Sequence, residues 1–194
     1  MSKRTGFLLA LAALGLIALT AAGCGGSDAE EEATRPPDYA KLLAGSPAPL
    51  AKLHSEGNEL LGGGLAAYEE RIASLRGYPV VVNTWASWCD PCRQEFVDFQ
   101  RAAAKFGKRV AFLGVNTEDG DDTASAFLRD HPVPYPSYAD PDSEITESLG
   151  ASRGLPNTAY YDADGELVLF KQGQYFDEDG LENDIRRYAL GEGG

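Results

Sequence analysis

Two cysteines, Cys89 and Cys92, lie between a segment with the pattern of a strand and a segment with the pattern of a helix. The preceding stretch YPVVVNTWAS, residues 78–87, is β-branched, aromatic and free of charged residues, which predicts a buried strand. After the pair, apolar residues recur at steps of four and three, as on one face of a helix: Cys92, Phe96, Phe99, Ala103 and Phe106. The order predicts an α/β protein with a Cys-x-x-Cys pair where a helix begins.

The rest of the chain continues this alternation. The β-branched run at 109–117 predicts a second central strand, and residues 157–173 predict a hairpin that turns at Asp164 and Gly165. Helical patterns are expected at 65–75, 121–131, 143–149 and 181–188. Together these segments predict a central mixed β-sheet flanked by helices. With the Cys-x-x-Cys pair between strand and helix, the pattern is typical of a thioredoxin-like fold.

The first 23 residues have the features of a targeting segment. Lys3 and Arg4 precede an apolar run at 7–22 that is short for a membrane span and ends in small residues directly before Cys24. This resembles a bacterial lipoprotein signal, in which the cysteine receives a lipid, although Ala21 stands where Leu is usual; an ordinary secretory signal is the alternative. We expect a signal peptide at 1–23, an acidic, Pro-containing disordered tether at 24–44 and a thioredoxin-like domain at 45–194.

These features predict a protein on the outer face of the cytoplasmic membrane, anchored by a lipid on Cys24. Compartments outside the cytoplasm commonly permit disulfides, and Cys89 and Cys92 then have only each other to pair with. The net charge of −13 offers no basic patch for phosphates, which argues against nucleic acid as a partner. No unpaired cysteine or long apolar surface helix indicates an interface, so we expect a monomer.

The cysteine pair admits three interpretations. A zinc site needs four ligands. The only histidines are His54 and His131, which are isolated from each other and from the pair, and Cys24 is expected to carry the lipid. We therefore expect no metal and no cofactor other than the disulfide. A purely structural disulfide is a weak interpretation, because closing so small a loop removes little entropy from the unfolded chain and so stabilises the fold little. A redox-active disulfide is the interpretation that we favour.

The residues around the pair favour redox chemistry. Pro91 fits the first turn of a helix, where its missing N–H costs nothing, so Cys89 should stand where free N–H groups and the helix dipole favour its thiolate. Cys92, one turn later, should be buried and able to resolve a mixed disulfide on Cys89. Trp88 is expected to shield the couple, and the charge of Asp90 should oppose the thiolate somewhat.

The motifs together resemble those of the TlpA/ResA-like membrane-anchored thiol-disulfide oxidoreductases. They are GSPAPL, LRGYPVVVNTWASWCDPCRQEF, VAFLGVNTED, VPYPSYADPD and RGLPNTAYYDADGEL, in that order from Gly45 onward. The resemblance implies a thioredoxin-like fold with the insert usual in this family. The opening hairpin usual in the family is weak here, since AKLHSEGNELLGGG matches two strands poorly.

The resemblance also implies roles for particular residues. Pro156 corresponds to the family's cis-proline, and its loop would face the cysteine pair and leave the backbone of Leu155 free to bind an extended substrate. Glu95, three residues after Cys92, corresponds to a buried acid of related reductases that exchanges protons with the couple; a solvated helix carboxylate is the alternative. Asn83 stands where thioredoxin has its buried Asp.

The function expected is that of an extracytoplasmic protein disulfide reductase, with Cys89 as nucleophile and Cys92 as resolving cysteine; cytochrome c maturation is a process that it would serve. Its partners would be protein disulfide or thiol substrates and a membrane thiol electron donor. Alternatives are a disulfide-forming oxidase, a thiol peroxidase on the same fold and a non-catalytic, lipid-anchored binding module.

Overall fold

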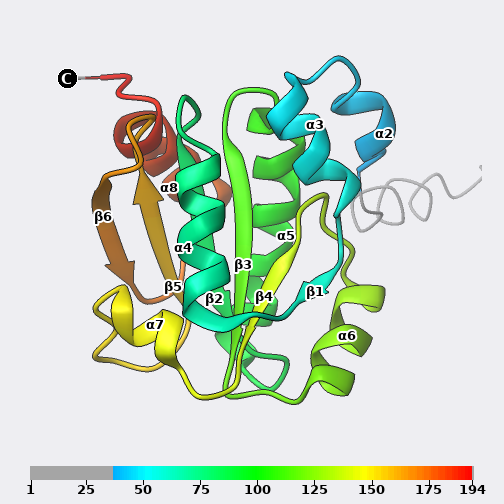
Figure 1. Ribbon diagram of the computed structural model, residues 1–194, viewed down its shortest axis with the longest axis vertical. Helices are drawn as coiled ribbons and strands as arrows, with labels where there is room; N and C mark the ends of the chain where they lie inside the picture. The colour runs from blue at the N-terminus through cyan, green and yellow to red at the C-terminus, as the bar shows by residue number, and fades with distance from the viewer. Residues whose placement is uncertain (1–36, 194) are drawn as a thin grey trace, which may run out of the picture. The chain divides into compact units, whose positions relative to one another are not determined.

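The structure is a computed structural model that describes residues 37–193, and its centre is one mixed β-sheet (Figure 1). The strands of the described residues form a six-stranded sheet in the order β1-β4-β3-β2-β5-β6. Their bounds are Leu60–Leu61 for β1, Val80–Trp85 for β2, Ala111–Thr117 for β3, Ser137–Asp140 for β4, Asn157–Tyr161 for β5 and Leu167–Gln172 for β6. The strands β1 to β4 pair in parallel, whereas β5 is antiparallel to both β2 and β6.

Helices cover both faces of this sheet (Figure 1). The helical segments before β3 are α2 (Tyr39–Leu42), α3 (Ala48–Ser55), α4 (Gly64–Ser74) and α5 (Asp90–Phe106). Those after it are α6 (Asp121–Asp130), α7 (Glu144–Ser148), α8 (Glu178–Asp184) and the π-helical segment η1 (Ile185–Ala189). None of the helices described is long and apolar enough to cross a membrane.

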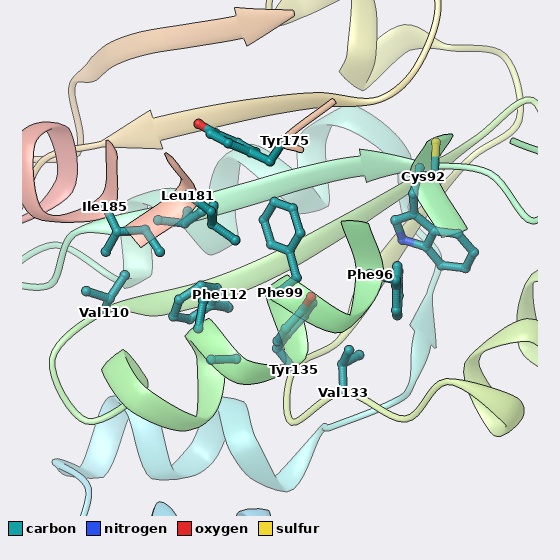
Figure 2. Close-up of a cluster of buried hydrophobic side chains, with 14 of the residues drawn as sticks. Cys92, Phe96, Phe99, Val110, Phe112, Val133, Tyr135, Tyr175, Leu181 and Ile185 are labelled. Carbon is teal, nitrogen blue, oxygen red and sulfur yellow. The ribbon is translucent and has the colours of Figure 1, made fainter. Parts of the chain in front are cut away.

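Two buried clusters lie on the two faces of the sheet because successive side chains of a strand point to opposite sides. Val81 and Trp85 of β2 pack with α5, α6, α8 and η1 on one face. Val80 and Val82 pack with α3, α4 and α7 on the other. Figure 2 shows Cys92 at one end of the first cluster, with Phe96 and Phe99 of the same helix beyond it.

The packing of α5 on the sheet follows from the apolar residues of one helix face. Phe96, Phe99 and Phe106 recur on the face turned to the sheet, and all three are buried. Burial of one such side chain contributes about 1.5–3 kcal/mol, so this face fixes the helix against the sheet. The Cys-x-x-Cys pair is thereby held at the carboxyl end of β2.

The expected strands and helices are present, with differences at the edges. The segment 24–44, expected to be a tether, contains helix α2 in its described part, where Leu43 is buried and Tyr39 Oη donates to the Pro132 carbonyl (3.1 Å). The short strand β1 pairs in parallel with β4 instead of forming an opening hairpin. At the C-terminus, α8 begins at Glu178 and continues into η1.

Candidate active site

The two cysteines form a disulfide at the N-terminus of α5. The S–S distance is 2.04 Å and the Cα–Cα distance is 5.3 Å. Cys89 is 4% exposed and Cys92 is 1% exposed, so Cys89 is the member of the pair nearer to solvent. An incoming thiol or disulfide therefore meets Cys89 first.

Cys89 is the N-cap residue of α5. Its Sγ accepts a hydrogen bond from the Cys92 backbone N–H (3.2 Å), and Pro91 occupies the first turn, where its missing N–H leaves no donor unpaired. A sulfur in this position receives both an amide donor and the positive end of the helix dipole. When the disulfide is reduced, this arrangement stabilises the thiolate of Cys89 over its thiol.

The loop before Cys89 is tied down by Asp119, which follows β3. The carboxylate of Asp119 accepts from the backbone N–H (2.6 Å) and the hydroxyl (3.0 Å) of Ser87, and also from Asn116 Nδ2 (3.1 Å) and Thr123 Oγ1 (2.6 Å). Burial alone would raise the pKa of Asp119, but these hydrogen bonds outweigh it and hold the pKa below the ordinary value. No sequence pattern identifies Asp119 as part of the site, because nothing in the sequence shows which loop its side chain contacts.

Trp88 directly precedes Cys89 and lies on the surface, where it is 57% exposed. Its indole Nε1 donates to the Glu118 carbonyl (2.9 Å), which fixes the ring over the loop after β3. Glu118 and Ser143 both have left-handed backbones, with φ of 51° and 60°. Such strain in residues other than glycine is concentrated at functional sites.

A groove of about 270 Å³ begins at Trp88. Leu155 lies on its wall. The other side chains come from the end of β3 and the loop after it, from α7 and its N-cap, and from the loop that leads to β5: Thr117, Glu118, Ser143, Thr146, Glu147, Ser152 and Arg153. Leu155 also packs against the cluster that contains Cys89 and Cys92. The groove thus joins the exposed indole to the loop that precedes β5.

The peptide bond between Leu155 and Pro156 is cis, the conformation that the resemblance implies. Pro156 is buried, and the Asn157 that follows is fixed on β2: its backbone N–H and Nδ2 both donate to Thr84 Oγ1 (3.1 Å each). The Gly154 carbonyl accepts from Asn157 Nδ2 (3.2 Å). These bonds hold the proline loop against the strand that ends at the disulfide.

Glu95, three residues after Cys92 on α5, is a buried acid and only 1% exposed. Asn83 Nδ2 donates to its Oε1 and the Tyr175 backbone N–H to its Oε2, both at 2.9 Å. Burial raises the pKa of Glu95 to about 7, against the lowering effect of these two donors and of Lys171. A carboxyl with a pKa near neutrality can both release and accept a proton at physiological pH.

The other residues named from the sequence lie elsewhere. Cys24 lies outside the described residues. Asp90 is exposed in the first turn of α5. His131 stacks on Phe127, with Nδ1 3.2 Å from that residue's carbonyl, and His54 lines a different groove beside α2. Tyr175 and Lys171, which surround Glu95, were missed because the sequence does not show that the loop after β6 returns to α5.

The fold and the site together define a thioredoxin-like protein with a disulfide at the start of the helix after β2 and a cis-proline directly before the neighbouring strand β5. The chain belongs to the AhpC/TSA family, whose model matches residues 45–170.

Known relatives agree with this class. The chain is 40% identical over 92 residues to the thiol:disulfide interchange protein DsbE of Allochromatium vinosum, covering 47% of this chain and 49% of that protein. It is 26% identical to the thiol-disulfide oxidoreductase ResA of Bacillus subtilis, covering 53% of this chain and 57% of ResA. A solved DsbE structure from Chlorobium tepidum has a TM-score of 0.55 and 29% identity, covering 59% of this chain and 82% of that chain. The chain spans about half the length of the two curated relatives.

Proposed function

We propose that the protein is an extracytoplasmic thiol-disulfide oxidoreductase that reduces disulfides in other proteins. The observation that carries this proposal is the Cys89–Cys92 disulfide, in which Cys89 caps α5 and lies nearer to solvent than its partner. The relatives, named as thiol-disulfide oxidoreductases and interchange proteins, support the same chemistry.

The reaction begins from the reduced pair. The Cys89 thiolate attacks one sulfur of a substrate disulfide, so a mixed disulfide forms and the other substrate sulfur leaves as a thiolate that takes up a proton. Cys92 then loses its proton and attacks Cys89 Sγ, which releases the second substrate sulfur as a thiol. Two electrons pass from the pair to the substrate, and the Cys89–Cys92 bond is restored.

Glu95 is the proposed base for the second step. It follows Cys92 on the same buried side of α5, and its pKa of about 7 leaves it partly ionised at neutral pH. Its carboxylate can accept the Cys92 proton and release it once the disulfide has formed. The Asn83 amide cannot take that role, because it donates to Glu95 and carries no ionisable proton.

The proposed substrate segment lies in the groove between Trp88 and Leu155. Its walls combine apolar surface with Glu118, Glu147 and Arg153. Pro156 has no backbone N–H, and the backbone of Leu155 before it is the proposed partner of an extended substrate. We propose a protein substrate, such as an apocytochrome c before haem attachment, and a membrane thiol donor that reduces the pair again. The proposed location is the outer face of the cytoplasmic membrane, through a lipid on Cys24, with the protein as a monomer.

Reduction of insulin disulfides by the purified protein with dithiothreitol tests this function. We expect Cys89→Ser to abolish the activity above the dithiothreitol background, because no nucleophile is left at the helix N-terminus. When the reduced Cys92→Ser protein is mixed with insulin after removal of dithiothreitol, it should accumulate a mixed disulfide on Cys89, visible as a mass increase on a non-reducing gel.

Two results would count against the proposal. Equal insulin reduction by the wild type and Cys89→Ser would leave a binding module as the function. Rapid consumption of peroxide that survives Cys92→Ser would assign the site to a thiol peroxidase.

A further inference from the structure

A row of polar residues crosses the sheet from Asn83, which donates to Glu95, to the edge strand β6. Asn83 of β2 is directly opposite Thr158 of β5, and Thr158 is directly opposite Lys171 of β6. Residues opposite each other in a sheet share a face, and the neighbours Trp85, Tyr160 and Leu169 show that this is the α5 face. Lys171 therefore lies on the side of the sheet where Glu95 is buried.

Lys171 also holds the loop that binds Glu95. Its Nζ donates to the carbonyls of Gly173 (2.7 Å) and Gln174 (3.1 Å) and lies 4.0 Å from the ring centroid of Tyr175. The backbone N–H of Tyr175 is in turn the donor to Glu95 Oε2. One lysine thus fixes three consecutive residues, of which the last binds the buried carboxyl group.

Two buried oxygen atoms of the row make no hydrogen bond within the described residues. Within residues 37–193, neither Asn83 Oδ1 nor Thr158 Oγ1 has a hydrogen-bond partner. A buried polar atom without a partner costs about 1–3 kcal/mol, and native proteins contain few of them. Each of these two oxygen atoms can still accept a hydrogen bond.

The groups that act on Glu95 come from each element packed around it. Burial has the largest effect, and Asp98 on α5 adds to it by disfavouring the carboxylate. The phenols of Tyr135 and Tyr160 also interact with Glu95. The cation among these groups is Lys171, whose own pKa is lowered by burial but raised by Glu95 and Asp184.

We propose that Lys171 is a positioning residue for thiol-disulfide exchange, which favours the ionised form of Glu95 through its charge and through the loop 173–175. The proposal rests on the proposed function, because it matters for catalysis only if Glu95 exchanges protons with Cys92. Its structural basis is the row Asn83–Thr158–Lys171 together with the contacts of Lys171 to that loop.

The test is a titration of Glu95 by carbon NMR in the oxidised, full-length protein, with Glu95→Gln to assign the signal. Lys171→Gln removes the charge and keeps a donor for the loop carbonyls, whereas Lys171→Arg keeps the charge. We expect Lys171→Gln to move the titration to higher pH and to lower the ionised fraction at pH 7 about threefold or more, one pKa unit being a factor of ten. In Lys171→Arg, which keeps the charge, the Glu95 titration should stay close to that of the wild type.

Lys108→Gln is the matched control, because it removes one exposed positive charge elsewhere on the chain. The proposal is overturned if Lys171→Gln and Lys108→Gln leave the Glu95 titration equally unchanged, even if Lys171→Gln lowers thermal stability. A separate result would concern only the proposed function: if Glu95→Gln leaves the pH profile of exchange unchanged while Lys171→Gln still shifts the titration, Glu95 is not the base but Lys171 still controls it.

Discussion

At the scale of single residues, Glu95 links the chemistry of the site to the stability of the fold. Burial raises its pKa from 4.5 to about 7, so between these values the folded protein holds a proton that the unfolded chain has lost. The resulting stability is fully present below about pH 4.5 and is lost as the pH rises through about 7. The difference amounts to about 3 kcal/mol.

Glu95→Gln should therefore flatten the fall in unfolding free energy of the oxidised protein between pH 5 and pH 8, measured by urea denaturation at several pH values. Its absolute stability should also drop, because an amide NH₂ would face Asn83 Nδ2 or the Tyr175 N–H. Glu70→Gln, at an exposed position of α4, is the control that should keep the slope. An unchanged slope in Glu95→Gln would mean that Glu95 does not titrate in this range.

The residue scale also includes the charge beside the nucleophile. Asp90 directly follows Cys89 and is exposed in the first turn of α5. Its carboxylate repels a thiolate on Cys89, so Asp90→Asn should increase the thiolate fraction at neutral pH. Ultraviolet thiolate absorbance of the reduced protein measures this, with Asp122→Asn on α6 as the control. A lower thiolate fraction in Asp90→Asn would show that Asp90 favours the thiolate in some other way.

At the scale of elements, the position of the turn before α5 depends on the loop that follows β3. Asp119 accepts the Ser87 N–H and hydroxyl and so fixes the turn between β2 and the disulfide. In Asp119→Asn, the new NH₂ group would face donors instead of accepting from them. We expect a loss of about 1–3 kcal/mol in unfolding free energy and slower disulfide exchange.

Urea denaturation and insulin reduction measure the two effects of Asp119→Asn, and Asp122→Asn again serves as the control because Asp122 is exposed. The lowered pKa of Asp119 makes this effect depend on pH. The contribution of Asp119 to the unfolding free energy is present at neutral pH and disappears as the pH falls through that pKa. Wild-type exchange rates in Asp119→Asn would show that the turn keeps its shape without this carboxylate.

At the scale of the whole molecule, the sheet order brings the parts of the site together. Because β2 lies between β3 and β5, the loops of Asp119 and Pro156 lie on either side of the disulfide.

The anchor proposed at Cys24 would be joined to this domain through residues 25–36, outside the described part. We expect Cys24→Ser to move the protein from the membrane fraction to the soluble fraction of cells, with Cys92→Ser remaining membrane-bound. A Cys24→Ser protein that stays with the membrane would contradict the lipid anchor.

The sequence by itself determined the local structure and the chemistry of the cysteine pair. The run before Cys89 and the apolar steps after Cys92 are local patterns, and periodicity is enough to predict a strand and a helix from them. Pro91 likewise predicts the helix start, because its fixed φ and missing N–H suit the first turn. The positions of Glu95 and Pro156 came from the resemblance to a family.

Only the tertiary structure decided which distant residues surround the pair. The contacts of Asp119 with Ser87 and of Tyr175 with Glu95 join positions 32 and 80 residues apart, and no local pattern encodes such pairs. The partly buried Lys171 looks in the sequence like any charged residue of an edge strand. Its position on the face of Glu95 follows from strand order and register, which are set by the packing of the whole sheet.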